Sequence, residues 1–123
     1  MKNAHGKERR FGPRVEENFV VSYRVYGDVK TLDTSHTKNI GEGGMFLTTN
    51  RTFDHGTMLA LELRLPFAPI PIRLLGKVIE CREIAKNLIY ETRLSFTYMD
   101  SESKEYVKNT VSYFVKKDRD QKR

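Results

Sequence analysis

The stretch Asn39-Ile40-Gly41-Glu42-Gly43-Gly44 places three glycines within four positions of a chain that holds only eight glycines in 123 residues. The apolar segment Met45-Phe46-Leu47, which is typical of a strand, follows at once. Glycine is needed where the backbone adopts a positive φ or where another group approaches it closely. We therefore expect a sharp polar corner that leads into a strand, either as part of a ligand site or as a plain strand-end bulge.

The segment before this corner predicts a hairpin. Apolar and polar residues alternate through Phe19–Tyr26, which indicates a strand with one buried face, and Gly27-Asp28 predicts a turn. A second strand is expected through Thr34–Lys38 into the corner, resuming at Met45–Thr49. If the chain turns near residues 28–30, Asn39 lies opposite roughly residues 17–21. Arg14 should then lie at the same end of the domain as the corner.

Three more strands are expected after the corner. Leucines alternate with other residues over Leu59–Leu65, and Ile72–Arg82 forms a longer strand in which Gly76 marks a bulge or bend. The last strand, Leu88–Tyr98, follows a turn at Lys86-Asn87. About six strands in close succession, with turns about every 8–12 residues, predict a mainly β domain that is an antiparallel barrel or sandwich.

The last element is expected to be a helix of about 16 residues. Its apolar residues recur at helical spacing, at Val107, Val111, Phe114 and Val115. Asp100 or Ser101 can cap its start, and Lys116-Lys117 suits the negative end of the helix dipole. The apolar stripe must be covered, and the open end of a strongly curved sheet is the natural place.

Positive charge is concentrated at the two ends of the chain. The net charge is +6, and residues 1–14 hold five Lys/Arg against one Glu, whereas residues 116–123 hold five Lys/Arg against two Asp. Basic ends suggest an anionic partner, although for the C-terminal end simple solubility is the preferred interpretation. We expect a flexible N-terminal arm at 1–14, one domain at 15–117, and a basic tail at 118–123.

Several classes of protein are not favoured by this sequence. We expect no membrane span and no signal peptide, because no apolar run is long enough. The single Cys81 precludes an internal disulfide and suits a reducing cytoplasm. His5, His36 and His55 lack metal-ligand spacing, and no nucleophile motif is present. The sequence therefore predicts neither an enzyme nor a bound metal or cofactor.

The residues near the corner predict the chemistry of a ligand. Arg10 and Arg14 carry planar guanidinium groups that bind phosphate oxygens in pairs and can read O6 and N7 of guanine. Asn39 can hydrogen-bond a base edge, and Gly41 and Gly44 leave room for an anion to reach backbone N–H groups. The ligand implied by these groups is anionic, planar and contains guanine.

The order Arg10-x-x-x-Arg14 followed by Asn39-x-Gly41-x-x-Gly44 resembles the PilZ domain, whose pattern is RxxxR followed by (D/N)xSxxG. The resemblance covers the chain from about Arg9 to Phe114. It implies a six-stranded antiparallel barrel with a C-terminal helix, and a receptor for the bacterial second messenger cyclic di-GMP. By this resemblance Arg10 and Arg14 hold phosphate and guanine, Asn39 contacts guanine, and Gly44 shapes the corner. Arg9 would influence whether one nucleotide or a stacked pair binds.

The sequence departs from the family pattern at Gly41, where the family has serine. Glycine lacks the serine hydroxyl that would contact the ligand. We expect a cyclic di-GMP receptor that signals to an unidentified protein partner in processes such as motility or biofilm formation. One alternative is a PilZ-fold adaptor that binds no nucleotide. Another is a small basic barrel that binds nucleic acid. It is disfavoured because most strand aromatics share the face expected to form the core.

Overall fold

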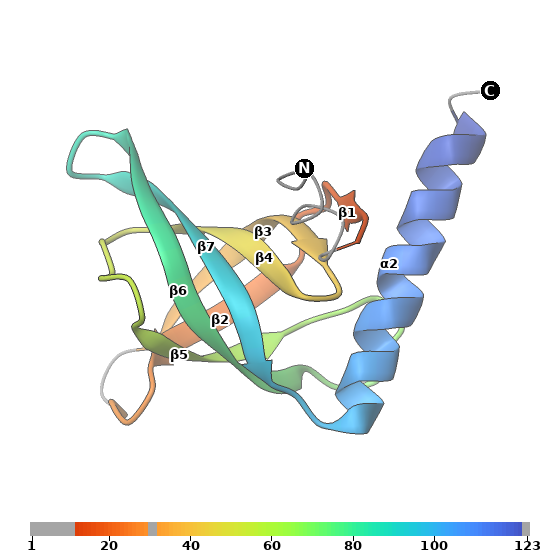
Figure 1. Cartoon of the computed structure of the whole chain (residues 1–123), viewed down its shortest axis with the longest axis horizontal. Helices are drawn as coiled ribbons and strands as arrows, with labels where there is room; N and C mark the ends of the chain where they lie inside the picture. The colour runs from red at the N-terminus through yellow and green to blue at the C-terminus, as the bar shows by residue number, and fades with distance from the viewer. Residues whose placement is uncertain (1–11, 30–31, 122–123) are drawn as a thin grey trace, which may run out of the picture.

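The strands form one antiparallel sheet that closes on itself (Figure 1). The computed structural model describes residues 12–29 and 32–121. In them it places β1 (Arg14–Val15), β2 (Val20–Val25), β3 (Asp33–Gly41), β4 (Gly44–Thr49), β5 (Met58–Leu63), β6 (Ile72–Ala85), β7 (Ile89–Tyr98) and the helix α2 (Ser101–Gln121). The sheet order is β1-β3-β2-β5-β6-β7-β4, and a further pairing of β3 with β4 closes six strands into a barrel. The barrel is thereby confirmed, and the sandwich alternative is wrong.

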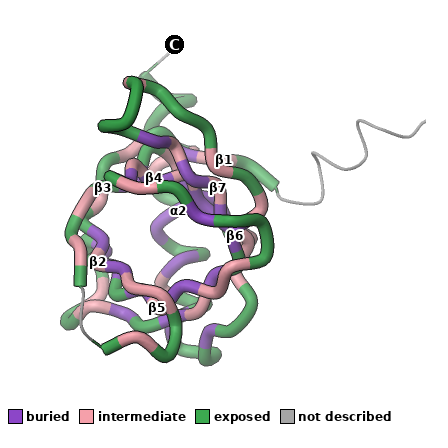
Figure 2. The backbone as a smooth tube through the Cα atoms, turned by 90° about the vertical axis from the view of Figure 1, so that its left-hand side faces the viewer, coloured by how far each residue is buried: buried purple, intermediate pink, exposed green. Residues whose placement is uncertain are grey.

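The alternation read from the sequence sets which side chains fill the barrel. Val21 and Tyr23 of β2 are buried, and the outward-facing Ser22 between them is only half-buried. Leu59, Leu61 and Leu63 of β5 are also buried, so each strand contributes every second residue to one common core. Figure 2 shows these buried positions recurring along the tube around the barrel.

The first two strands lie end to end along one edge of β3. Arg14 and Val15 pair with Gly41 and Ile40, whereas Val20 pairs with His36. The buried hydroxyl of Thr37 bridges the break between β1 and β2. It accepts a hydrogen bond from the Phe19 backbone N–H over 2.9 Å and donates one to the carbonyl oxygen of Glu17 over 2.6 Å. Thr37 therefore fixes where the chain ahead of β2 meets the end of β3.

Gly76 lies in a strand irregularity, as the sequence predicts. The register between β6 and β7 shifts between Leu75 and Gly76. A Cβ atom added at Gly76 would lie 3.1 Å from Cδ1 of Leu61, so a larger residue would crowd the core.

The helix α2 packs its apolar stripe against the barrel beside β1 and β3 (Figure 1). Val107 and Val111 are buried, and Phe114 packs against Phe19 with ring centroids 5.7 Å apart. The carboxylate of Asp100 caps the helix by accepting a hydrogen bond from the Ser103 N–H over 2.8 Å. No described helix is long and apolar enough to cross a membrane.

The helix end expected near Lys117 is wrong, because α2 continues to Gln121. The segment assigned to a basic tail is therefore helical through residue 121. Lys116 and Asp120 are spaced i, i+4, which favours continuation of an exposed helix beyond its apolar stripe. Lys117 also keeps its ammonium 5.8 Å from the ring centroid of Phe114.

Candidate functional site

The candidate site is built at the end of β3, where β1 joins the sheet. Val15 of β1 is buried and pairs with Ile40, so it anchors the short strand in the core. Because side chains alternate across a strand, Arg14 faces outward beside its pairing partner Gly41. The sequence prediction that Arg14 and the glycine corner share one end of the domain is therefore confirmed. Arg14 belongs to β1 rather than to the arm expected at residues 1–14.

Arg14 connects the two parts of the candidate site directly. Its Nη1 donates one hydrogen bond to Oδ1 of Asn39 over 2.9 Å and another to the backbone oxygen of Gly44 over 3.3 Å. Since a guanidinium group can only donate, the carbonyl oxygen of the Asn39 amide must face Arg14. The amide nitrogen of Asn39 then points away from Arg14. It is a hydrogen-bond donor and can bond to an acceptor atom of a ligand.

A second arginine lies close to the first. The guanidinium carbon of Arg14 lies 5.4 Å from the ring centroid of Phe46, and that of Arg93 lies 5.9 Å from the same centroid. Burial lowers the pKa of Arg14 from its ordinary value, and repulsion from Arg93 lowers it further. Because the pKa of an arginine lies far above 7, Arg14 still carries its full positive charge at pH 7. The site is thus positively charged around a central aromatic ring.

Gly44 is required by strand packing. A Cβ atom added at Gly44 would overlap the carbonyl oxygen of Leu94 and lie 3.4 Å from Cα of Ser95 on β7. Positive φ values occur instead at Gly12, Gly27 and Gly56 among the described glycines. The structural reason for a glycine at position 44 is therefore the close approach of a neighbouring strand. Gly41 lies in the extended backbone of β3, so a side chain there meets no positive φ.

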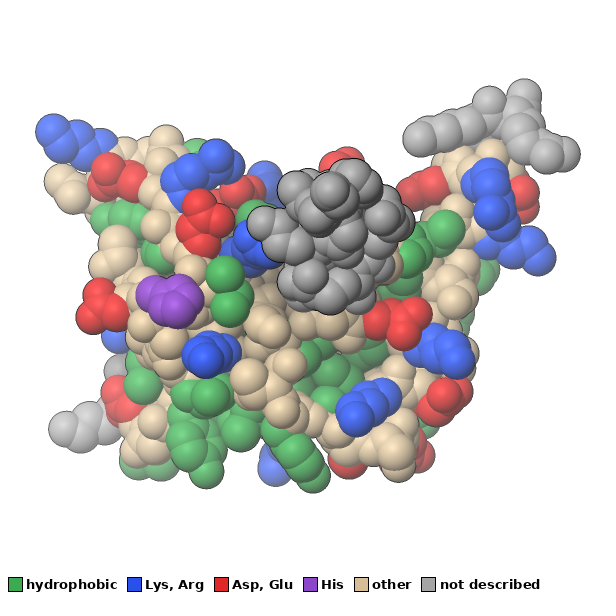
Figure 3. Space-filling view, viewed as in Figure 1, with side chains coloured by type: hydrophobic (Ala, Val, Ile, Leu, Met, Phe, Trp, Pro, Cys, Tyr) green, Lys and Arg blue, Asp and Glu red, His purple; other side chains and the backbone are tan. Residues whose placement is uncertain are grey.

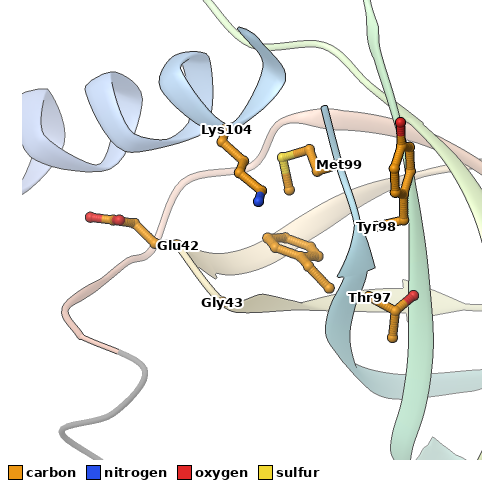
Figure 4. Close-up of a pocket in the computed structure, with 7 residues that line it drawn as sticks. Glu42, Gly43, Thr97, Tyr98, Met99 and Lys104 are labelled. Atoms are coloured by element: carbon orange, nitrogen blue, oxygen red, sulfur yellow. The ribbon is translucent and has the colours of Figure 1, made fainter. Parts of the chain in front are cut away.

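A shallow pocket lies on the other side of the glycine corner. It has a volume of about 380 Å³ and lies between the β3–β4 turn, the end of β7 and the first turn of α2. Figure 4 shows the ammonium of Lys104 directed toward the pocket, whereas the carboxylate of Glu42 points away from it. A cation therefore borders the corner on this side as well.

Not every expected site residue is placed. Arg14, Asn39, Gly41 and Gly44 come together, and Arg9 and Arg10 lie outside the described residues. Within the part of the chain that the structure describes, no group of three or more His, Cys, Asp or Glu residues could hold a metal ion.

Sequence reasoning missed two residues of this region, Phe46 and Arg93. Phe46 was expected in a strand, but not as part of the site. It faces outward because its neighbours Met45 and Leu47 are buried and side chains alternate along a strand. That alternation is a signal that the sequence contains. The proximity of Arg93 had no comparable signal, because it depends on how β7 pairs with β4 across 47 positions of sequence.

Comparison with known proteins gives a consistent result. A family model described as the PilZ domain matches residues 8–112. No curated protein matches the sequence.

Solved structures share the fold at low sequence identity. The Bacillus subtilis inhibitor of motility, MotI/DgrA, is 17% identical with a TM-score of 0.70, covering 89% of this chain and 51% of that one. The PilZ domain of YcgR from Escherichia coli, solved with c-di-GMP, is 11% identical with a TM-score of 0.63, covering 88% of this chain and 92% of that one. The K. pneumonia MrkH–c-di-GMP complex is 13% identical with a TM-score of 0.68, covering 89% and 53%. The chain thus spans about half the length of MotI and of MrkH.

Proposed function

Because the chain belongs to the PilZ domain family, we propose that it is a receptor for cyclic di-GMP that passes the signal to a protein partner. The observation that carries the proposal is the hydrogen bond between Arg14 and Asn39, which joins the two family motifs at one place. In the proposal Arg9 and Arg10, which precede β1 in the sequence, add further positive charge when the ligand binds. The protein acts by binding and has no catalytic role in this proposal.

The described groups match the chemistry of this ligand. Cyclic di-GMP carries two phosphodiester groups, each with one negative charge, and two guanine bases. The guanidinium of Arg14 can bind phosphate oxygens or the O6 and N7 acceptors of guanine. The amide nitrogen of Asn39, whose oxygen already accepts from Arg14, can donate to the same kind of acceptor. The YcgR PilZ domain and MrkH, each solved with c-di-GMP, share the overall fold of this chain.

The signal would pass through the segment ahead of β1. In the proposed mechanism the dianionic ligand draws residues 1–13 against the barrel by bridging Arg9 and Arg10 to Arg14 and Asn39. Since α2 packs against β1 and β3, the helix lies next to this change. A partner that contacts the helix and the arm together would distinguish the free from the bound form. We place the receptor in the bacterial cytoplasm, because its ligand is a bacterial second messenger and its single cysteine suits a reducing compartment.

One observation favours a second candidate, a PilZ-fold adaptor that works without the nucleotide. Gly41 offers no hydroxyl where the family pattern has serine. A missing hydrogen bond reduces affinity by about 0.5–1.5 kcal/mol, or up to about 3 kcal/mol when the partner is charged. The arginines contribute more than that, so we expect weakened binding rather than none.

Nucleic-acid binding is less well supported. On the face drawn in Figure 3, acidic and basic side chains are interspersed and do not form one continuous basic region. Non-specific binding of single-stranded nucleic acid relies on a basic groove lined with exposed aromatic rings. The described residues on the face drawn in Figure 3 do not present such a basic groove.

The test is calorimetric titration of the full chain with cyclic di-GMP, with GTP and a short single-stranded oligonucleotide as controls. We expect saturable binding of cyclic di-GMP alone. Binding of none of the three would support the adaptor that needs no nucleotide. Binding of the oligonucleotide alone would reject the receptor in favour of a nucleic-acid-binding barrel.

A further inference from the structure

A row of side chains crosses the outer face of the barrel from the candidate site to its far side. Asn39 on β3 pairs with Phe46 on β4, Phe46 pairs with Arg93 on β7, and Arg93 pairs with Glu80 on β6. Directly opposed residues of antiparallel strands share a face, with their Cβ atoms about 4.5–5.5 Å apart. The row therefore continues the site beyond its family motifs, onto strands that those motifs do not include.

We propose that Arg93 is a further ligand-binding residue, whose guanidinium binds a phosphate oxygen of the cyclic dinucleotide from the β7 side of the site. The inference rests on the proposed function, because it concerns the same ligand. It adds a residue that lies outside both sequence motifs and 54 positions beyond Asn39 in the chain.

The ring of Phe46 sets the position of this group. The guanidinium carbons of Arg14 and Arg93 lie 5.4 and 5.9 Å from its centroid, so both cations are held against one aromatic ring. Cation–π contacts of this kind restrain the side chains and orient the planar groups. Two donors held around a common ring form a fixed pair that a dianionic ligand can bridge.

Charge favours the same ligand. Arg14 and Arg93 are close enough for repulsion to lower the pKa of Arg14. An anion placed between two like charges removes this repulsion and gains attraction to both. A phosphodiester suits such a position, because the guanidinium fork donates two parallel hydrogen bonds to its oxygens.

Glu80 competes with the ligand only weakly. Its Oε1 lies 4.0 Å from Nη1 of Arg93, at the limit of an ion pair, and its side chain is 60% exposed. Exposed ion pairs of this kind contribute little to stability, so a phosphate can displace the carboxylate at small cost. Neutralising Glu80 should therefore strengthen binding of the nucleotide.

The experiment is calorimetric titration of cyclic di-GMP into the full-length wild type and four variants: Arg93→Ala, Arg93→Lys, Glu80→Gln and Arg73→Ala. Arg73 is the matched control, because it is also on the barrel surface and pairs with a glutamate, Glu62, over 3.4 Å. Removing either arginine changes the net charge equally, but Arg73 lies outside the row. Melting temperatures are measured for every variant.

We expect Arg93→Ala to weaken binding roughly tenfold to a hundredfold, as for loss of a charge-assisted hydrogen bond. The affinity of Arg93→Lys should lie between those of the wild type and Arg93→Ala, because an ammonium keeps the charge but lacks the planar guanidinium fork. Glu80→Gln should tighten binding about two- to fivefold. Arg73→Ala should stay within about twofold of the wild type.

The possible failures are distinct. No binding by the wild type would overturn the proposed function, and this inference with it. Binding by the wild type, with a folded Arg93→Ala variant no weaker than Arg73→Ala, would overturn this inference alone. Should Arg93→Ala not fold, unchanged dissociation constants for Arg93→Lys and Glu80→Gln would overturn it in the same way.

Discussion

Nη1 of Arg14 donates a hydrogen bond to Oδ1 of Asn39 over 2.9 Å, although the two residues stand 25 positions apart in the chain. The second bond of Arg14, to the carbonyl oxygen of Gly44, comes from the same nitrogen. A side chain held in this way needs less ordering when a ligand arrives, and such preorganisation favours affinity. The described part of the site is therefore assembled without a ligand, and the proposed ordering on binding concerns the residues ahead of β1.

Removing Arg14 or Arg10 should abolish binding of cyclic di-GMP or weaken it severely. A charge-assisted contact contributes on the order of 2–4 kcal/mol, which corresponds to a loss of roughly thirtyfold to nearly a thousandfold. Arg14→Ala and Arg10→Ala are compared with Arg73→Ala by calorimetric titration, and folding is checked by circular dichroism. Unchanged binding curves for both Arg10→Ala and Arg14→Ala would reject the site.

The ligand should slow hydrogen exchange in residues 1–13. The reason is the proposed bridging of Arg9 and Arg10 to Arg14, which would bring backbone amides of this segment against the barrel. The measurement is exchange followed by mass spectrometry, with and without saturating cyclic di-GMP. Peptides from β5, which lies apart from β1 in the sheet order, serve as the internal reference. Equal exchange of the N-terminal peptides in both conditions would contradict the switch.

Gly41→Ser should tighten binding by about twofold to a hundredfold, as expected for one regained hydrogen bond to the ligand. The condition for this gain is a backbone that serine tolerates, and Gly41 lies in the extended β3 strand opposite Arg14. Because Gly41 is buried, melting temperatures must accompany the dissociation constants. Weaker binding by a Gly41→Ser variant of unchanged stability would show that the missing serine hydroxyl does not limit the affinity of this site.

Gly44→Ala should destabilise the fold by about 1–3 kcal/mol or more, because the new methyl group overlaps the carbonyl oxygen of Leu94. Gly76→Ala is the matched control. The three atoms nearest to its methyl group would belong to the side chains of Leu61 and Leu94, at 3.1 Å or more, and not to a backbone carbonyl. Chemical denaturation of both variants provides the comparison. A smaller loss for Gly44→Ala than for Gly76→Ala would argue against the strand-packing role.

The cap of α2 should make stability depend on acid pH. Hydrogen bonds from Ser103, first from its backbone N–H, hold the pKa of Asp100 below its ordinary value of 3.8. A carboxylate with a lowered pKa stabilises the fold above its ordinary pKa, and this contribution is lost as the pH falls through the lower value. Asp100→Ala should therefore reduce the melting temperature at pH 7, with a difference that shrinks toward pH 2.

Asp100→Asn is the control for that experiment, because asparagine caps a helix without a titrating carboxyl group. The melting temperature of Asp100→Asn should equal that of the wild type at pH 7. As the pH falls, it should decrease less than that of the wild type, because asparagine has no carboxylate to protonate. A difference between Asp100→Ala and wild type that is the same at pH 7 and pH 2 would contradict the role of the ionised cap.

Local pattern determined the elements of this protein. Alternation of apolar side chains placed the strands, since every second residue must face the core, and the spacing of Val107 and Val111 placed the helix. The sharp corner after Asn39 also followed from its glycines. The end of α2 was misplaced because its last turns carry no apolar stripe, and exposed charged residues mark a helix end poorly.

Tertiary structure decided what those elements bring together. The hydrogen bond between Arg14 and Asn39 depends on β1 adding to the end of β3, and the approach of Arg93 to Phe46 depends on closure of β7 against β4. The overlap that forbids a side chain at Gly44 arises from the same closure. Strand register and barrel closure join residues tens of positions apart through the sum of many weak contacts, and no local stretch of sequence encodes that sum.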